Sequence, residues 1–197
     1  MFLRIHRFLP FTRAEGPGNR AWLWVQGCSI HCPGCAVPWT WDAKAGTVVE
    51  TASLAQQIVA QENIEGVTFL GGEPFDQAAA LADLGLRVRA VGLSVMTFTG
   101  FELEYIQRAN RDDWNSLLAV SDLLIDQPFR EELLDLSRPW VGSSNQRYHF
   151  LSDRYQHLAS ELNTMANRLE VRLQADGQVL VNGMATSANL RTLLKNL

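Results

Sequence analysis

The sequence has no fourth cysteine. Its 197 residues include three, all between positions 28 and 35, and an odd number in one short stretch does not suit a disulfide framework. A secretory signal is also missing. No apolar run approaches the ~20 residues needed to span a bilayer, since the run at 21–25 ends at Gln26 and Gly27. These absences predict a reduced, cytoplasmic protein with no membrane partner.

An excess of basic charge is absent as well. Seventeen Lys and Arg stand against 21 Asp and Glu, for a net charge of −4, so nucleic acid is not an expected partner. The sequence shows no linker, repeat or low-complexity tract. A length of 197 residues is enough for one good core and short for two, which predicts a single domain.

The cysteines form the most informative motif. Cys28, Cys32 and Cys35 have the spacing Cys-x3-Cys-x2-Cys and follow the apolar run at 21–25, which is typical of a buried strand. They should therefore occupy a loop at the carboxyl end of a strand, where α/β folds place their chemistry. Three thiolates can hold three irons of a [4Fe-4S] cluster, and the fourth iron then stays open to a substrate.

A structural zinc site is the alternative for the same cysteines. His31 or His6 could supply a fourth ligand, but His31 lies between two of the cysteines, and zinc modules usually pair cysteines as Cys-x2-Cys. An electron-transfer ferredoxin needs a fourth cysteine and a different spacing. The cluster interpretation is favoured over both.

A second motif, Gly71-Gly72-Glu73-Pro74, follows the short apolar run at 66–70. The two glycines would let the backbone at a strand end approach a ligand closely, and Glu73 would place a carboxylate or its backbone beside that ligand. Taken alone, the motif is more typical of an ordinary strand-to-helix turn than of a ligand site.

Helical and strand patterns alternate along most of the chain. Helices are predicted at 51–63 and 76–90 and from 102 onward, and strands at 3–9 (an edge strand), 66–70, 93–99 and 123–126. Right-handed crossovers build such an alternation into one parallel sheet. The predicted fold is an α/β open partial (β/α) barrel of residues 1–151. Residues 152–197 are expected to pack on it as an extension, with a helix at 153–168, a hairpin of 169–174 and 178–181, and a helix at 187–196.

The two motifs, in this order and at this distance, resemble the radical S-adenosylmethionine (radical SAM) enzymes. The segments 16–20, 27–35, 96–104 and 142–146 are similar within that family to the small single-cluster activases of anaerobic ribonucleotide reductases, which install glycyl radicals. The resemblance covers residues 16–151. At 126–129 the family has Asp-Gly-x-Phe and this chain has Asp-Gln-Pro-Phe, so Gln127 stands where a glycine would permit a positive φ.

The resemblance implies site residues and cofactors. A [4Fe-4S] cluster on Cys28, Cys32 and Cys35 would bind S-adenosyl-L-methionine, with the remaining predicted contacts made by Gly34, Ala36, Gly71, Gly72, Glu73, Thr97, Thr99 and Asn145. The implied activity is reductive cleavage of SAM to a 5′-deoxyadenosyl radical that activates a glycyl radical enzyme. The implied partners are that large protein and an electron donor such as flavodoxin or ferredoxin.

Two other functions stay open. A radical SAM enzyme acting on a peptide or small molecule is favoured by the altered turn at Gln127 and by the C-terminal extension. A non-catalytic iron-sulfur or zinc protein that binds a partner is the alternative of another class.

Overall fold

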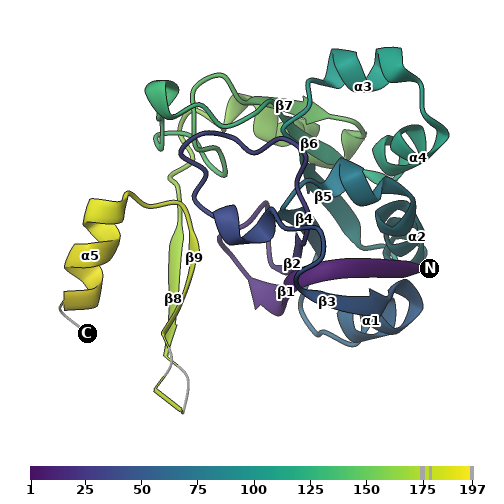
Figure 1. Cartoon of the computed structure of the whole chain (residues 1–197), viewed down its shortest axis with the longest axis horizontal. Helices are drawn as coiled ribbons and strands as arrows, with labels where there is room; N and C mark the ends of the chain where they lie inside the picture. The colour runs from purple at the N-terminus through teal and green to yellow at the C-terminus, as the bar shows by residue number, and fades with distance from the viewer. Residues whose placement is uncertain (174–175, 178, 196–197) are drawn as a thin grey trace.

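The computed structural model describes residues 1–173, 176–177 and 179–195. Within these residues a seven-stranded sheet separates a layer of helices from a two-stranded hairpin (Figure 1). The sheet contains β1 (Phe2–Thr12), β2 (Arg20–Val25), β3 (Thr47–Glu50), β4 (Gly66–Gly71), β5 (Ser94–Phe98), β6 (Leu123–Asp126) and β7 (Arg147–Phe150). The α-helices are α1 (Thr51–Val59), α2 (Ala78–Arg89), α3 (Leu103–Ala109), α4 (Asp112–Val120) and α5 (Ser187–Lys195). Four 3-10 helices are η1 (Pro38–Thr40), η2 (Pro74–Gln77), η3 (Glu131–Leu133) and η4 (Asp153–Ser160).

The strand order is β3-β1-β2-β4-β5-β6-β7. Strands β2, β4, β5 and β6 are parallel, which confirms a parallel sheet for the predicted helix–strand alternation. The outer strands depart from it, because β1 pairs antiparallel with β2 and with β3, and β7 pairs antiparallel with β6. The strand predicted at 3–9 is present within β1, but its placement at the edge is wrong, since the four residues of β3 pair with residues 2–5 and take the edge instead.

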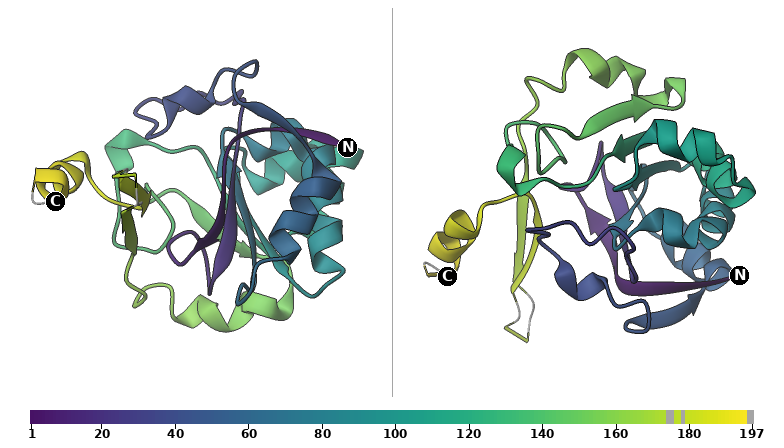
Figure 2. Two further views of the ribbon diagram at one scale, coloured as in Figure 1. Left: turned by 90° about the horizontal axis from the view of Figure 1, so that it is seen from below. Right: turned by 45° about the horizontal axis from the view of Figure 1, so that its top comes forward.

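Helices cover one face of the sheet. Alternate residues of β2, including Leu23 and Val25, point into a core that also contains Ile58 of α1, Leu84 of α2 and Leu117 of α4. The left view of Figure 2 shows α1, α2 and α4 gathered on this side. The carboxyl ends of the parallel strands lie together at one edge of the sheet.

The other alternate residues of the strands point to the opposite face of the sheet. Met96, Leu123 and Ile125 pack there against Trp140 and Tyr155. Arg20 is also fully buried on this side, where its Nε donates to Thr68 Oγ1 (2.8 Å) and its guanidinium to the Tyr155 hydroxyl (2.9 Å).

The C-terminal region differs from its prediction in part. The predicted helix at 153–168 is confined to η4, whereas the hairpin is present as β8 (Leu169–Leu173) and β9 (Val179–Gly183), followed by α5. The predicted strand ends at Gln174 and Gln178 and the last residue of the predicted helix, Asn196, lie outside the described residues.

The hairpin is joined to the segment between β1 and β2. Thr12 donates to Glu170 Oε2 (2.6 Å), and the backbone N–H of Gly183 donates to Glu15 Oε1 (2.8 Å). Figure 2 shows the hairpin across from the helices, on the other side of the sheet. In the part of the chain described, no helix has the length and apolar character required to cross a membrane.

Candidate functional site

Four strand ends meet at one edge of the sheet. Because β2, β4, β5 and β6 run parallel, the segments that follow them lie side by side. These segments are the cysteine loop (residues 26–37), the glycine-rich turn (residues 71–77), Thr99-Gly100 and Asp126-Gln127. The structure therefore brings the two main sequence motifs together.

The cysteine loop carries three free, half-buried thiols. Burial raises the pKa of Cys28 to about 11. The backbone N–H groups of His31 and Ile30 favour the thiolate and oppose this rise, but they do not cancel it. Burial also raises the pKa of Cys32, and the Phe129 N–H opposes that shift. Without a metal these two thiols hold their protons, and a bound metal ion would displace them. N–H groups aimed at sulfur are also a known means of tuning iron-sulfur clusters.

His31, the candidate fourth zinc ligand, is engaged in a ring contact. It stacks on Trp41, with ring centroids 4.7 Å apart. Among the described residues, no three His, Cys, Asp or Glu side chains are placed to share one metal ion.

The glycines of the glycine-rich turn are required by contacts within the chain. A Cβ on Gly72 would lie 2.0 Å from the carbonyl oxygen of Gly27, the residue before Cys28. A Cβ on Gly71, whose φ is +105°, would lie 2.8 Å from Trp24 Cα. The glycines were expected to let the backbone approach a ligand closely. In the structure they let it approach the cysteine loop, at Gly72, and β2, at Gly71.

Glu73 links the ends of β4 and β5. Its carboxylate accepts hydrogen bonds from Phe75 N (2.8 Å), Gly100 N (2.8 Å) and Thr99 Oγ1 (2.9 Å). The side chain is buried, and burial raises its pKa to about 7 although these three donors favour the charged form. The carboxylate therefore holds two strand ends in register, and its backbone N–H donates to the Gly27 carbonyl (2.8 Å).

The two threonines differ in their distance from this edge. The Thr97 hydroxyl is fully buried and lies 2.8 Å from Ser121 Oγ, which itself donates to the Leu117 carbonyl. Thr97 must therefore donate to Ser121, which leaves it no proton for a cofactor. Thr99 is adjacent to the site, and its hydroxyl is used by Glu73.

Gln127 and Asn145 lie beside each other near the end of β6. Gln127 takes a φ of +79°, so the turn expected of a glycine is kept with a side chain in the left-handed region. Asn145 Nδ2 donates to the Pro128 carbonyl (2.9 Å). Its Oδ1 is buried and has no hydrogen-bond partner among the described residues.

Gly34 and Ala36 are exposed on the cysteine loop. Gly34 has a φ of +73°, and a Cβ there would lie 2.8 Å from Glu131 Oε2. Beside it a hollow of about 360 Å³ opens at Cys32, lined by Ile30, Cys32, Pro33 and residues 128–132. Phe129 belongs to the motif at 126–129, whereas no sequence pattern pointed to residues 130–132, which reach the cysteine loop only through the turn at Gln127.

A charged cluster at the end of β6 was also missed. Asp126 is fully buried and accepts from Arg147 Nε (3.0 Å) and Leu103 N (2.9 Å), and His149 Nε2 lies 3.0 Å away. These hydrogen bonds outweigh burial and lower its pKa to about 2. The basic partners come from β7, an antiparallel strand without a clear sequence signal.

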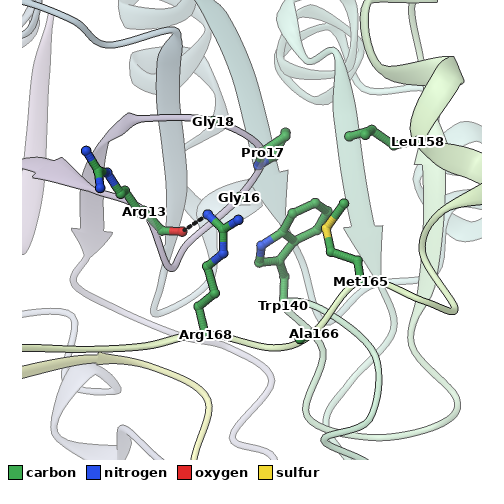
Figure 3. A pocket seen from close by; sticks show the side chains of 9 residues that line it. All are labelled: Arg13, Gly16, Pro17, Gly18, Trp140, Leu158, Met165, Ala166 and Arg168. Carbon is green, nitrogen blue, oxygen red and sulfur yellow. Dashed lines mark hydrogen bonds between the residues drawn. The ribbon is translucent and has the colours of Figure 1, made fainter.

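A smaller hollow lies away from the cysteines. It has a volume of about 100 Å³ and is lined by residues 16–18 together with Arg13, Trp140, Met165 and Arg168 among others (Figure 3). None of the predicted site residues lines it.

Comparison with known proteins supports the cluster assignment. Residues 14–149 match a family model described as a 4Fe-4S single cluster domain. The anaerobic ribonucleoside-triphosphate reductase-activating protein of Escherichia coli (strain K12) is 30% identical over 158 residues, which cover 76% of this chain and 99% of the relative. The protein of the same name from Vibrio cholerae is 30% identical over 156 residues, 75% of this chain and 97% of the relative.

A solved structure also shows some similarity. QueE from Escherichia coli aligns with a TM-score of 0.43 and 19% identity, over 51% of this chain and 53% of that one. A likeness of this size carries no inference about function. The match to the family model and the coverage of the activating proteins establish that the chain belongs to the 4Fe-4S single cluster domain family, in the radical SAM activase group that its sequence resembles.

Proposed function

We propose that this protein is a radical SAM activase, which binds a [4Fe-4S] cluster and S-adenosylmethionine and abstracts hydrogen from a glycyl radical enzyme. The observation that carries the proposal is the meeting of three free thiols with the glycine-rich turn at the carboxyl edge of the parallel strands. The relatives are named as activating proteins of anaerobic ribonucleoside-triphosphate reductases. A reductase of that kind is the proposed partner.

The ligand assignment follows the donor set. Cys28, Cys32 and Cys35 hold three irons of the cluster, because all three lie in one loop and are free of other covalent partners. When bound, the cluster and SAM together supply a 5′-deoxyadenosyl radical after one-electron reduction of the sulfonium. The protein's own residues bind and orient these groups and keep water away from the reacting atoms.

The proposed SAM contacts fall into two sets. Gly34 and Ala36 are exposed on the cysteine loop, and Asn145 carries an unpartnered acceptor next to Pro128, which lines the hollow at Cys32. Gly71, Gly72, Glu73 and Thr99 act mainly by holding the strand ends, and the methionine end of SAM is proposed to lie beside them. Thr97 is the weakest of the predicted contacts, because its hydroxyl is bound to Ser121.

We also propose that the sheet is an open partial barrel, with residues 1–151 as its core. Helices cover one face of the sheet, and the hairpin lies on the side of the opposite face (Figure 2). The extension, proposed as residues 152–197, packs on this core through its hairpin, which forms hydrogen bonds with Thr12 and Glu15 of the core. An open side is where a large partner and an electron donor such as flavodoxin or ferredoxin would approach.

A direct test is to mix the reconstituted protein anaerobically with reductant, SAM and the anaerobic ribonucleotide reductase of the same organism. The expected result is a glycyl radical signal in electron paramagnetic resonance (EPR) of the reductase. A signal that needs this protein, SAM and all three cysteines supports the proposal. Its absence, with SAM cleavage intact, would overturn the choice of partner.

One observation favours a second candidate, a radical SAM enzyme acting on a peptide or small molecule. The match to the family model ends at residue 149, and the extension beyond it reaches Gly142. A Cβ on Gly142 would lie 3.1 Å from both Met184 Cε and Phe129 Cδ2, so Met184 and Phe129, whose N–H faces Cys32, both lie beside Gly142.

Truncation after Arg168 separates the two candidates. If the shortened chain keeps its cluster and still activates the reductase, the hairpin is peripheral to the activase. Rapid SAM consumption by the intact chain with a small substrate, lost on truncation, would favour the second candidate.

A further inference from the structure

The approach to Cys28 is held by the glycine-rich turn. Three hydrogen bonds join the two segments, from Gly72 N to the Val25 carbonyl (2.9 Å), from Gln77 Nε2 to the Gln26 carbonyl (2.9 Å) and from Glu73 N to the Gly27 carbonyl (2.8 Å). Every carbonyl of the three residues before Cys28 is thus fixed by this turn. On the other side of the loop, the N–H of Cys28 donates to the Trp41 carbonyl (3.2 Å).

Asp76 extends this hold past Cys28. Its Oδ2 accepts from the backbone N–H of Ser29 (2.7 Å), and its Oδ1 accepts from the Ser29 hydroxyl (2.8 Å). Both residues are exposed and lie 47 positions apart in the sequence. Asp76 is kept in place by η2, where its own N–H donates to the Glu73 carbonyl (3.1 Å).

The two sides of Cys28 are therefore held by different means. Before it, two of the three donors are backbone groups that a side-chain substitution leaves in place. After it, both hydrogen bonds end on one carboxylate. Cys32 and Cys35 lie farther along, in a turn closed by a hydrogen bond from Cys35 N to the Cys32 carbonyl (3.1 Å).

We propose that Asp76 is a positioning residue, which fixes Ser29 and so sets Cys28 in place before the cluster binds; this inference rests on the proposed function. A ligand ordered in advance loses less conformational freedom when the metal group binds. Asp76 does not touch the cluster in this account. It acts through the backbone of the residue next to the ligand.

The effect can be measured on the full chain before reconstitution. Each thiol is alkylated with iodoacetamide and the modified peptides are quantified by mass spectrometry, with Cys35 as the reference within the same molecule. Asp76→Ala should raise the ratio of Cys28 to Cys35 modification about fivefold, the change expected when hydrogen bonds worth ~1 kcal/mol are removed. Asp76→Asn should stay near wild type, because an amide can accept from Ser29 N and donate to its hydroxyl.

Two further variants complete the set. Ser29→Ala removes the hydroxyl bond and keeps the N–H bond, so its ratio should fall between those of the wild type and Asp76→Ala. Glu62→Ala is the matched control, because Glu62 is an exposed carboxylate between α1 and β4, away from the cysteine loop. It should leave the ratio unchanged.

The reconstituted protein gives the second readout. Iron should leave Asp76→Ala about fivefold faster than wild type under a chelator, with a changed EPR spectrum of the reduced cluster, and Asp76→Asn should restore both. If Asp76→Ala matches Glu62→Ala in alkylation ratio and in iron release, Asp76 has no positioning role. A wild-type protein that takes up no iron would instead overturn the proposed function, and with it the role of Asp76 toward a cluster.

Discussion

Replacing Gly72 with alanine should displace the cysteine loop. The new Cβ would lie 2.0 Å from the Gly27 carbonyl oxygen and 2.8 Å from its carbon, and ordinary contact begins at 3.4 Å. The two segments must therefore separate by about 1.4 Å. The atoms in the way belong to the backbone, so no side chain can turn aside to make room.

The same movement would stretch two hydrogen bonds. These are the bonds from Gly72 N to the Val25 carbonyl (2.9 Å) and from Glu73 N to the Gly27 carbonyl (2.8 Å). Overpacking of a tight site costs about 1–3 kcal/mol, and each weakened hydrogen bond costs ~1 kcal/mol. We expect the free energy of unfolding of Gly72→Ala to fall by about 3–5 kcal/mol. Because Gly27 precedes Cys28, iron uptake should fall as well.

Urea unfolding and iron analysis of the reconstituted variant measure these two effects. Gly92→Ala is the control, because its Cβ would meet nothing within 4 Å and only its φ of +86° opposes the substitution. That variant should lose about 1 kcal/mol and keep its iron. A Gly72→Ala protein with wild-type stability and full iron content would refute the reasoning, since its only strong contact is with Gly27.

Three other changes test two buried carboxylates and one strained turn. Burial raises the pKa of Glu15 to about 7 from 4.5, so its contribution to the free energy of unfolding is present below pH 4.5 and is lost as the pH rises through 7; denaturation of Glu15→Gln across this range should show a flatter pH profile, and an unchanged profile would contradict the assignment. Asp126→Ala leaves Arg147 without its buried partner and should lower the free energy of unfolding by about 3 kcal/mol. A loss below about 1 kcal/mol would show that the ion pair between Arg147 and Asp126 is replaceable. Gln127 has a φ of +79°, so Gln127→Gly should be about 1 kcal/mol more stable than Gln127→Ala in urea unfolding, and equal stabilities would show that the turn is not strained.

Local patterns predicted much of the parallel sheet. The run at 123–126 became β6 with the same bounds, and 66–70 became β4 with one more residue. Both segments are short, apolar and followed by polar or turn residues, which is typical of buried parallel strands. The strands β3 and β7 were missed because each is stabilised by pairing with β1 or β6, which no local pattern reveals.

The site was predictable where a motif carries its own chemistry. The three cysteines and the glycine-rich turn were placed at one edge from spacing and strand order, and the structure places both there. Spacing alone could not show that Gly72 is required by Gly27, or that the Thr97 hydroxyl is bound to Ser121. Such contacts depend on which distant segments of the chain lie next to a residue in the folded structure.

Asp76 is a further case of this limit. Its carboxylate meets Ser29 across 47 positions of sequence, and an aspartate in the first turn of a helix is ordinarily explained by the helix dipole. The positioning role of Asp76 follows only from the packing of the turn after β4 against the cysteine loop, where Asp76 meets Ser29.

The central claim is that three cysteines hold a cluster which leaves one iron open to SAM. Anaerobic reconstitution followed by iron analysis and a 5′-deoxyadenosine assay, on the wild type and on alanine variants of Cys28, Cys32 and Cys35, tests it most directly. The account predicts about four irons per chain and SAM-dependent 5′-deoxyadenosine in the wild type, with both lost in each variant. Stoichiometric zinc without iron, or SAM cleavage that survives the loss of any one of the three cysteines, would contradict it.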